Sequence, residues 1–391
     1  MPAVTANVRF AAGYQRPQTT LSRWGGWLPL PALKRQGGRC HANHEHWEPP
    51  VMDITTIGLD LAKNVFQVHA INSAGEVVVR RALRRAQMIP FFSKLAPCLV
   101  GIEACGTSHH WARELVRLGH QVRLMPPAYV KAYVKRGKTD AADAEAICEA
   151  VSRPTMRFVA IKSVDQQAAL SLHRARDLLV RQRTQLVNLV RGLLAEFGVN
   201  IPRGITHALA FARRIVAGEA QEVPELAAKV VGALAAQALA VQDQVRGLER
   251  ELMAWYRASA LARRIATVPG VGLLGATALA ATVTDPGQFR SGRQFAAWLG
   301  LTPRLNSSGG KERLGRISKM GDRYLRRLLI VGMTSLVRQA KRGPGATDPR
   351  LAQLLARKPA RVATVAMANR AARVIWAIMT RGGVYRAPQA A

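Results

Sequence analysis

The sequence predicts an α/β domain followed by an all-α part, and three observations carry this prediction. Short apolar runs separated by turn residues fill residues 54–125, as expected for strands that alternate with helices. Leucine then recurs every seven residues through Gln166–Phe197, which is typical of a helix packed on another helix. After Arg263, apolar residues with helical spacing surround a Pro-Gly-Val-Gly turn. With 391 residues, the chain can fill two or three domains of roughly 100–200 residues each.

The predicted α/β domain has five strands, at Ile54–Leu61, Val65–Ile71, Glu76–Leu83, Cys98–Glu103 and Val122–Met125. Residues 72–75 (Asn-Ser-Ala-Gly) predict a hairpin turn between the second and third strands. Helices are expected near 84–95, at His109–Leu118, around Ala128–Lys135 and from Thr139 onward. Three antiparallel strands followed by strand–helix alternation is the order of an RNase H-like (RuvC-like) domain.

The second predicted part is an antiparallel coiled-coil arm. Leu172, Leu179, Leu186 and Leu193 form one heptad position, and Ala175, Gln182 and Leu189 form a second. Arginines 174, 176, 181 and 183 are expected on the other faces. After a break from Gly198 to Pro224, Leu226–Trp255 predicts the returning helix, with Val241, Val245, Leu248 and Leu252 on one stripe. The periodicity alone does not decide between an intramolecular arm and a dimer seam.

The third predicted part is a small helical domain with a helix–hairpin–helix-like motif. In the turn, Gly270 and Gly272 allow backbone N–H groups to approach phosphate, unless the motif is an ordinary helical turn. Between Arg290 and Arg381 there are 20 Lys and Arg residues against three acids, which favours a nucleic-acid-binding face.

The composition points in the same direction. The chain has 57 Lys and Arg against 24 Asp and Glu, a formal net charge of +33, so a nucleic-acid partner is favoured. A hydrophobic content of 49% excludes a disordered basic tail. The four cysteines form no CxxC pair, which indicates reduced thiols in a cytoplasm. No apolar run reaches roughly 18 residues, so no membrane association is expected.

We divide the chain into five segments. Residues 1–51 are a disordered extension or a misassigned start, since they are rich in Gly, Pro, Arg and Trp without sustained periodicity. The RNase H-like domain is placed at 52–160, the coiled-coil arm at 161–258, the helical domain at 259–383 and a tail at 384–391.

Four acidic residues stand out in this basic chain. Asp60 follows an apolar strand segment, Glu103 ends another, and Asp140 and Asp143 lie three apart at a predicted helix start. Each residue alone is better explained as a turn or capping residue. Together they provide the hard oxygen ligands that Mg²⁺ prefers, and one or two ions held there could activate the attacking oxygen in phosphodiester cleavage.

A second candidate site lies in a glycine-flanked, basic loop. Ser307 and Ser308 are the candidate nucleophiles, and no histidine lies nearby to act as a base, so composition favours a phosphate-binding loop over catalysis. The nucleic-acid-binding residues expected here are Arg304, Lys311, Arg313, Arg316 and Lys319, with Lys63 and Lys138 beside the acidic residues.

The motifs resemble those of a known family. The segments 58–63 (Gly-Leu-Asp-Leu-Ala-Lys), 101–106 (Gly-Ile-Glu-Ala-Cys-Gly) and 138–144 (Lys-Thr-Asp-Ala-Ala-Asp-Ala) resemble the acidic motifs of the DEDD insertion-sequence transposases of the "one-ten" lineage. The segments 268–272, 295–303 and 308–321 resemble the C-terminal transposase domain of that family. The resemblance runs from about Met52 to Gly383, with the motifs in the same order.

The resemblance implies a recombinase that moves its own element. In that family the four acids bind Mg²⁺, which carries over to Asp60, Glu103, Asp140 and Asp143. The family also uses a serine before a glycine as nucleophile, which makes Ser308 the candidate for a covalent phosphoserine link to DNA, ahead of Ser307. It further implies donor and target double-stranded DNA, a structured guide RNA from the element, and a homo-tetramer built as a dimer of dimers.

Two other hypotheses compete with that of a Mg²⁺-dependent transposase. The chain could be a RuvC-like structure-specific nuclease, such as a junction resolvase, that uses activated water and leaves the serine domain without a role. It could also be a nucleic-acid binder without catalysis, in which the acids are dispensable.

Overall fold

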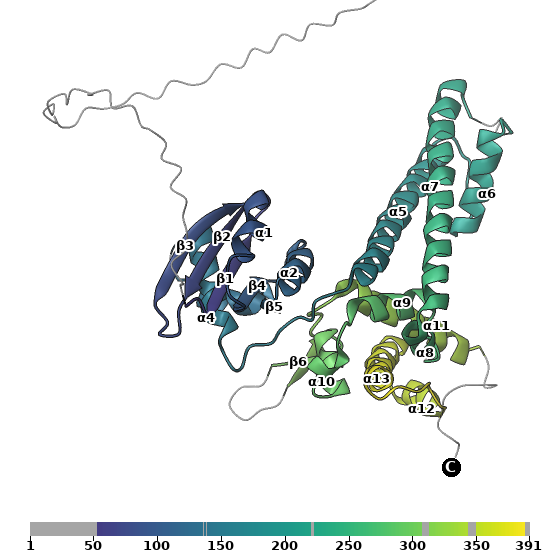
Figure 1. Ribbon diagram of the computed structural model, residues 1–391. Coiled ribbons are helices and arrows are strands. Elements are labelled where there is room, and N and C mark those ends of the chain that lie inside the picture. Colours follow the sequence, from purple (N-terminus) through teal and green to yellow (C-terminus); the bar gives the residue numbers. More distant parts are fainter. Residues whose placement is uncertain are drawn as a thin grey trace, which may run out of the picture. The chain divides into compact units, whose positions relative to one another are not determined.

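The computed structural model describes residues 53–135, 137, 139–219, 223–306, 313–342 and 349–387. The segment predicted as a disordered extension, 1–51, lies outside the described residues. The α/β domain and the helical remainder are each described by themselves below (Figure 1).

The α/β domain is built on a five-stranded sheet in the order β3-β2-β1-β4-β5. Its strands are β1 (Thr56–Leu61), β2 (Val65–Ile71), β3 (Val77–Arg84), β4 (Leu99–Glu103) and β5 (Gln121–Met125). The pairs β1–β2 and β2–β3 are antiparallel, and β1–β4 and β4–β5 are parallel. All five predicted strands are present, and their order and directions are consistent with an RNase H-like domain.

Two layers of helices cover this sheet. On one face, Ile57 and Leu59 of β1 belong to a core that includes Phe92 of α1 (Met88–Phe92) and Trp111 of α2 (Ser108–Arg117). On the other face lies α4 (Asp140–Val151). The short helices of the domain are η1 (Arg85–Gln87), α3 (Pro127–Val130) and η2 (Lys131–Tyr133). The helices expected near 84–95 and 128–135 are therefore each divided into an α-helical and a 3-10 turn.

Two glycines let α4 lie directly on the sheet. Gly58 of β1 and Gly101 of β4 are register partners, so they occupy the same face. A Cβ added to Gly58 would lie 2.1 Å from the carbonyl oxygen of Ala144, and one added to Gly101 would lie 2.7 Å from the Cβ of Val151. Because real Cβ atoms do not approach other atoms this closely, only glycine permits this helix–sheet distance.

The helical part begins with an antiparallel pair, α5 (Val164–Ala195) and α7 (Glu225–Ala258), which run side by side in Figure 1. Arg176 of α5 donates to Oε1 of Glu249 from Nε at 2.8 Å and from Nη2 at 2.6 Å. Arg183 donates to Gln242, one heptad away on each helix. These pairs fix the antiparallel register of the two helices.

The packed face of α5 differs from the predicted one. Its buried residues include Ala169, His173, Val187, Val190 and Leu194, which keep a seven-residue pattern on positions beside the predicted ones. The predicted second heptad position does not pack on α7, because Ala175, Gln182 and Leu189 are all exposed in the single chain. Arg176 and Arg183, expected on outer faces, instead lie in the seam with α7.

The returning helix follows the prediction more closely. Val241, Val245 and Leu252 of the predicted stripe on α7 are buried, and Leu248 is half-buried. The stretch from Gly198 to Pro224, expected to be a break, contains the helix α6 (Ile205–Val216), which packs on α7.

The C-terminal part is mainly helical, as expected. Its helices are α8 (Ala260–Ile265), α9 (Leu273–Thr282), η3 (Pro286–Gln288), α10 (Gly292–Trp298), α11 (Arg323–Ala340), α12 (Pro349–Arg357) and α13 (Ala360–Arg381). They share a core that includes Leu279, Phe295, Leu329 and Ile375. This part also contains an unpredicted two-stranded antiparallel sheet of β6 (Pro303–Leu305) and β7 (Leu314–Ile317).

Two helices have the length and composition of a membrane span. Both α7 and α13 contain an 18-residue window with a mean hydropathy of 1.2, although no such run was expected. The core helices of soluble proteins meet the same criterion, and both helices contribute buried residues to the cores described above.

A buried histidine joins α5 to the C-terminal helices. Nδ1 of His173 lies 3.0 Å from the hydroxyl of Tyr324, and its Nε2 lies 3.0 Å from Oγ1 of Thr277. The Thr277 hydroxyl donates to the carbonyl of Leu273, so His173 donates to it from Nε2. In the neutral ring, Nδ1 then accepts from the Tyr324 hydroxyl. Burial, followed by the charge of Arg176, lowers the pKa of His173 to about 4.

We predict that Gly58→Ala destabilises the α/β domain, because its Cβ would clash with the backbone of α4. Overpacking of this kind costs about 1–3 kcal/mol. The free energy of unfolding in urea measures the effect. Gly106→Ala is the matched control, since Gly106 is exposed and a Cβ there would meet nothing within 4 Å. Equal stability of the two variants would contradict the packing argument.

We also predict an acid-sensitive contribution from His173. Its pKa is lowered from 6.5 to about 4 in the folded state, so the unfolded chain binds more protons between these values. Stability is therefore lost as the pH falls from about 6.5 to about 4. The variant His173→Gln should show a smaller drop in melting temperature between pH 7.5 and pH 4.5 than the unchanged protein. The exposed His207→Gln should keep the full drop.

Candidate active site

The sheet brings the first two predicted acids to one edge. Leu59 of β1 pairs with Ile102 of the parallel strand β4, and Asp60 and Glu103 each follow directly. Each acid lies two residues after one of the packing glycines, so it shares the face that α4 covers. Both carboxyl side chains are half-buried at the carboxyl ends of their strands.

The helix α4 supplies the other two acids. Thr139 caps its first turn by accepting a hydrogen bond from the backbone N–H of Ala142 at 3.2 Å. Asp140 and Asp143 both lie in that first turn. The positive end of the helix dipole stabilises carboxylates at this position, which offsets part of their mutual repulsion.

Three of the four acids converge closely. One carboxylate oxygen from each of Asp60, Asp140 and Asp143 lies within 4.8 Å of the others. Across the part of the chain that the structure describes, no other trio of His, Cys, Asp or Glu side chains approaches this closely. Glu103 is outside this trio, although its charge acts on Asp60.

Electrostatics identify Asp60 as the centre of the group. Burial, followed by the negative charges of Asp143, Asp140 and Glu103, raises the pKa of Asp60 from 3.8 to about 6. A hydrogen bond from the backbone of Leu61 opposes this shift. The carboxylates thus repel one another without a cation among them, and their hard oxygens suit a divalent ion such as Mg²⁺.

The sequence reasoning missed neighbours of this group on β2. Gln67 pairs with Asp60 across the antiparallel strands, and the buried His69 pairs with Gly58, so both share the face that carries Asp60. Burial and then the charge of Arg80 lower the pKa of His69. The alternation of β2 puts both residues on one face, but only the strand register places them beside Asp60.

The predicted basic loop is described in part. Ser307, Ser308 and Lys311 lie outside the described residues, as does Lys138 near the acidic group. The strands flanking the loop are fixed, since the N–H of Asn306 donates to the carbonyl of Arg313 at 2.8 Å. The predicted cations Arg304, Arg313, Arg316 and Lys319 are all exposed on or beside this hairpin.

Backbone geometry constrains the base of the hairpin. Lys319 has a φ of 56°, the one positive value among the described non-glycine residues. Its N–H donates to the carbonyl of Gly300 at 3.1 Å. The buried Arg326 donates to the carbonyls of Leu299 and Met320 at 3.0 and 2.8 Å. These bonds hold the predicted cation Lys319 in a strained conformation, which is a common feature of functional sites.

The remaining predicted residues have different environments. Gly270 has a φ of 78°, a left-handed conformation that favours glycine, and a Cβ there would lie 3.1 Å from the carbonyl oxygen of Gly332 on α11. Gly272 is exposed at the N-terminus of α9 and has open space around it. Lys63 is exposed in the turn between β1 and β2, three residues after Asp60.

Two family models match this chain. One is a DEDD-type model described as "Transposase", which covers residues 57–198 and so includes all four acids. The other is described as "Transposase IS116/IS110/IS902 family" and covers residues 262–346, which include the hairpin β6–β7.

Curated relatives match over most of their length. The chain is 50% identical over 336 residues to a "Probable family 20 transposase" of Pseudomonas aeruginosa, covering 86% of this chain and 99% of the relative. It is 40% identical to the transposase for insertion sequence element IS1111A of Coxiella burnetii, covering 85% and 92%. It is 38% identical to the transposase for IS1328 of Yersinia enterocolitica, covering 85% and 99%. The chain belongs to the IS110 family of insertion-sequence transposases.

Proposed function

We propose that this transposase cleaves and exchanges DNA strands with a divalent ion, Mg²⁺, held by Asp60, Asp140 and Asp143, with Glu103 as a fourth acid. The observation that carries the proposal is the convergence of three carboxylates within 4.8 Å in a chain of net charge +33. A basic protein that gathers acids at one sheet edge gains a cation-binding site beside a phosphate-binding surface.

The roles of the four acids follow from their positions. Asp60 is central because the charges of the other three acids all act on its carboxylate, so Asp60 would contribute most directly to binding a cation. Asp140 is exposed and therefore faces an arriving phosphodiester, whereas Asp143 is half-buried between helix and sheet. A bound divalent ion would supply Lewis acidity to the scissile phosphate and lower the pKa of an attacking hydroxyl. The exposed Lys63 nearby is suited to hold the DNA backbone.

We propose Ser308 as the nucleophile, ahead of its neighbour Ser307. The Oγ of Ser308 would lose its proton and attack phosphorus, forming a phosphoserine bond. The bond from phosphorus to a deoxyribose oxygen would break, and that oxygen would take up a proton as it leaves. The exposed cations Arg304, Arg313, Arg316 and Lys319 flank this loop and would stabilise the charge of the pentacoordinate phosphorus. The alternative is a nuclease in which water attacks and no covalent bond to the protein forms.

The partners are part of the same proposal. The substrates are donor and target double-stranded DNA, with a structured guide RNA from the element as a third nucleic acid. The assembly is a homo-tetramer in the bacterial cytoplasm. Sequencing nucleic acid that copurifies with the expressed protein tests the RNA, and light scattering of the purified complex tests the tetramer.

We predict that Asp60→Asn abolishes metal binding while stabilising the metal-free protein. The raised pKa of Asp60 means that the folded state binds its proton more tightly than the unfolded chain, so stability falls as the pH rises from about 4 to about 6. Removing the charge removes this loss. In EDTA at pH 8 the variant should melt at a higher temperature than the unchanged protein.

Addition of Mg²⁺ should reverse that order. The unchanged protein should gain melting temperature with Mg²⁺, and this gain should shrink below about pH 6 as Asp60 becomes protonated. Asp243→Asn on α7, exposed and far along the chain from the acidic group, is the matched control and should respond like the unchanged protein. A Mg²⁺ response that survives in Asp60→Asn would refute the site.

We further predict that Ser308→Ala eliminates a covalent protein–DNA adduct. Labelled element-end DNA is incubated with protein and Mg²⁺ and resolved on a denaturing gel. Ser307→Ala, one residue away, serves as the control and should keep the adduct. Loss of the adduct in Ser307→Ala alone would move the nucleophile to that residue. DNA cleavage without any adduct in the unchanged protein would favour attack by water.

A further inference from the structure

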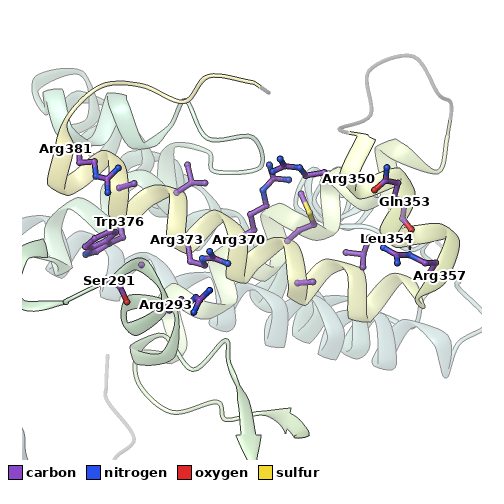
Figure 2. A pocket seen from close by; sticks show the side chains of 15 residues that line it. Ser291, Arg293, Arg350, Gln353, Leu354, Arg357, Arg370, Arg373, Trp376 and Arg381 are labelled. Carbon is purple, nitrogen blue, oxygen red and sulfur yellow. Dashed lines mark hydrogen bonds between the residues drawn. The ribbon is translucent and has the colours of Figure 1, made fainter. Parts of the chain in front are cut away.

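A hollow of about 920 Å³ in the C-terminal part is lined by six arginines. They come from three helices: Arg293 from α10, Arg350 and Arg357 from α12, and Arg370, Arg373 and Arg381 from α13 (Figure 2). Among the residues that the structure describes, no acid lines this hollow, which we name the arginine groove. Neither the acidic group nor the hairpin β6–β7 contributes to it.

The groove is held in shape by fixed contacts between its helices. A Cβ on Gly292 would lie 3.0 Å from Cα of Arg373, so α10 touches the backbone of α13 and places Arg293 beside Arg373. The indole of Trp376 donates to the carbonyl of Pro286 at 3.1 Å, and Asn369 donates to the carbonyl of Leu301 at 3.2 Å. The arginine positions are therefore set before any ligand arrives, which lowers the entropic cost of binding.

Four of the groove arginines are exposed and belong to no ion pair within the described ranges. They are Arg293, Arg357, Arg373 and Arg381. Gathering like charges in one hollow costs stability through repulsion. A bound polyanion would remove that cost.

The lining and dimensions favour a nucleic-acid strand over other anions. This groove presents guanidinium groups from three helices, whereas small-molecule pockets hold only a few polar groups. From Arg370 to Arg381 the helix rises about 16 Å at 1.5 Å per residue. A stacked strand with one phosphate per about 3.4 Å would place about five phosphates along that distance, which the α13 arginines 370, 373 and 381 span and to which α10 and α12 add further arginines.

The apolar residues between the arginines distinguish a strand from a bare phosphate. Trp376, Met367 and Leu354 also line the groove, and Trp376 is held by its hydrogen bond. Proteins that bind single strands combine a basic groove with aromatic surfaces on which bases stack. A concave groove also admits one strand more readily than a duplex, whose own grooves accept protruding protein elements.

We propose that the arginine groove binds the phosphodiester backbone of a single nucleic-acid strand of about five nucleotides, DNA or RNA. The proposal goes beyond the cleavage chemistry and shares with the proposed function only that the ligand is nucleic acid. The groove would bind an unpaired strand at a site separate from the acidic group.

The test measures binding of fluorescent oligonucleotides to the full chain in EDTA, where cleavage cannot contribute. The probes are one sequence as single-stranded DNA, as single-stranded RNA and as duplex DNA. The groove variant is Arg357→Gln with Arg373→Gln. The control variant is Arg203→Gln with Arg213→Gln. It removes the same charge from two exposed positions, one just before α6 and one within it.

The groove variant should bind at least one of the two single-stranded probes about tenfold or more weakly, since bonds to charged groups contribute about 1.5–3 kcal/mol each. The slope of log affinity against log salt should fall by about 1.4, or 0.7 for each lost phosphate contact. The RNA and DNA arms identify which strand the groove prefers. The melting temperature of the groove variant should equal or exceed that of the unchanged protein, which excludes misfolding as the cause.

Three results would overturn the proposal. The first is single-strand affinity within twofold of the control variant for both DNA and RNA. The second is a loss for duplex DNA equal to or greater than that for single strands. The third is displacement of the strand by polyglutamate as effectively as by an oligonucleotide of equal charge. Adding the two groove substitutions to Asp60→Asn should weaken strand binding by the same factor as in the unchanged protein, so failure of the metal site and failure of the groove are distinguishable.

Discussion

The contact between α4 and two glycines on adjacent strands is the constraint on which the candidate site depends. Gly58 and Gly101 are register partners, and each precedes its acid by two residues. The face that admits the helix backbone is therefore the face that carries the carboxylates. Any larger residue would lift α4 from the sheet and separate Asp143 from Asp60. Helix packing and site geometry are thus one requirement.

Local sequence patterns predicted the α/β domain well, whereas contacts between residues far apart in the sequence were harder to predict. All five strands, the helix that begins near Thr139 and the clustering of Asp60, Asp140 and Asp143 followed from alternation, turn residues and spacing. The face of α5 that packs on α7 was not predicted, because it contains Arg176 and Arg183. Arginine is usually a surface residue, and only the partners of these two on α7 explain their place between the helices. The arginine groove combines three helices, and no linear pattern joins Arg293 to Arg373. Ser308, outside the described residues, stays a prediction from family resemblance.

The acidic group and the arginine groove have one property in common, since each gathers charges of the same sign. Burial and the repulsion of neighbouring acids raise the pKa of Asp60 to about 6, and the arginine groove gathers six arginines with no acid among its described lining. Both arrangements are unfavourable for the protein alone and are imposed by packing, through Gly58 in one case and Gly292 in the other. In the roles proposed above, a cation at one place and a polyanion at the other would relieve this repulsion.

The polar seam of the arm limits how its length can change during evolution. Arg176 meets Glu249 and Arg183 meets Gln242, one heptad apart on each helix. Inserting a few residues between Arg176 and Arg183 alone would turn one arginine away from its partner. Between the two pairs the helices can therefore change length only by matched steps of seven residues, so variation in arm length should be concentrated beyond Arg183 and before Gln242, toward the tip.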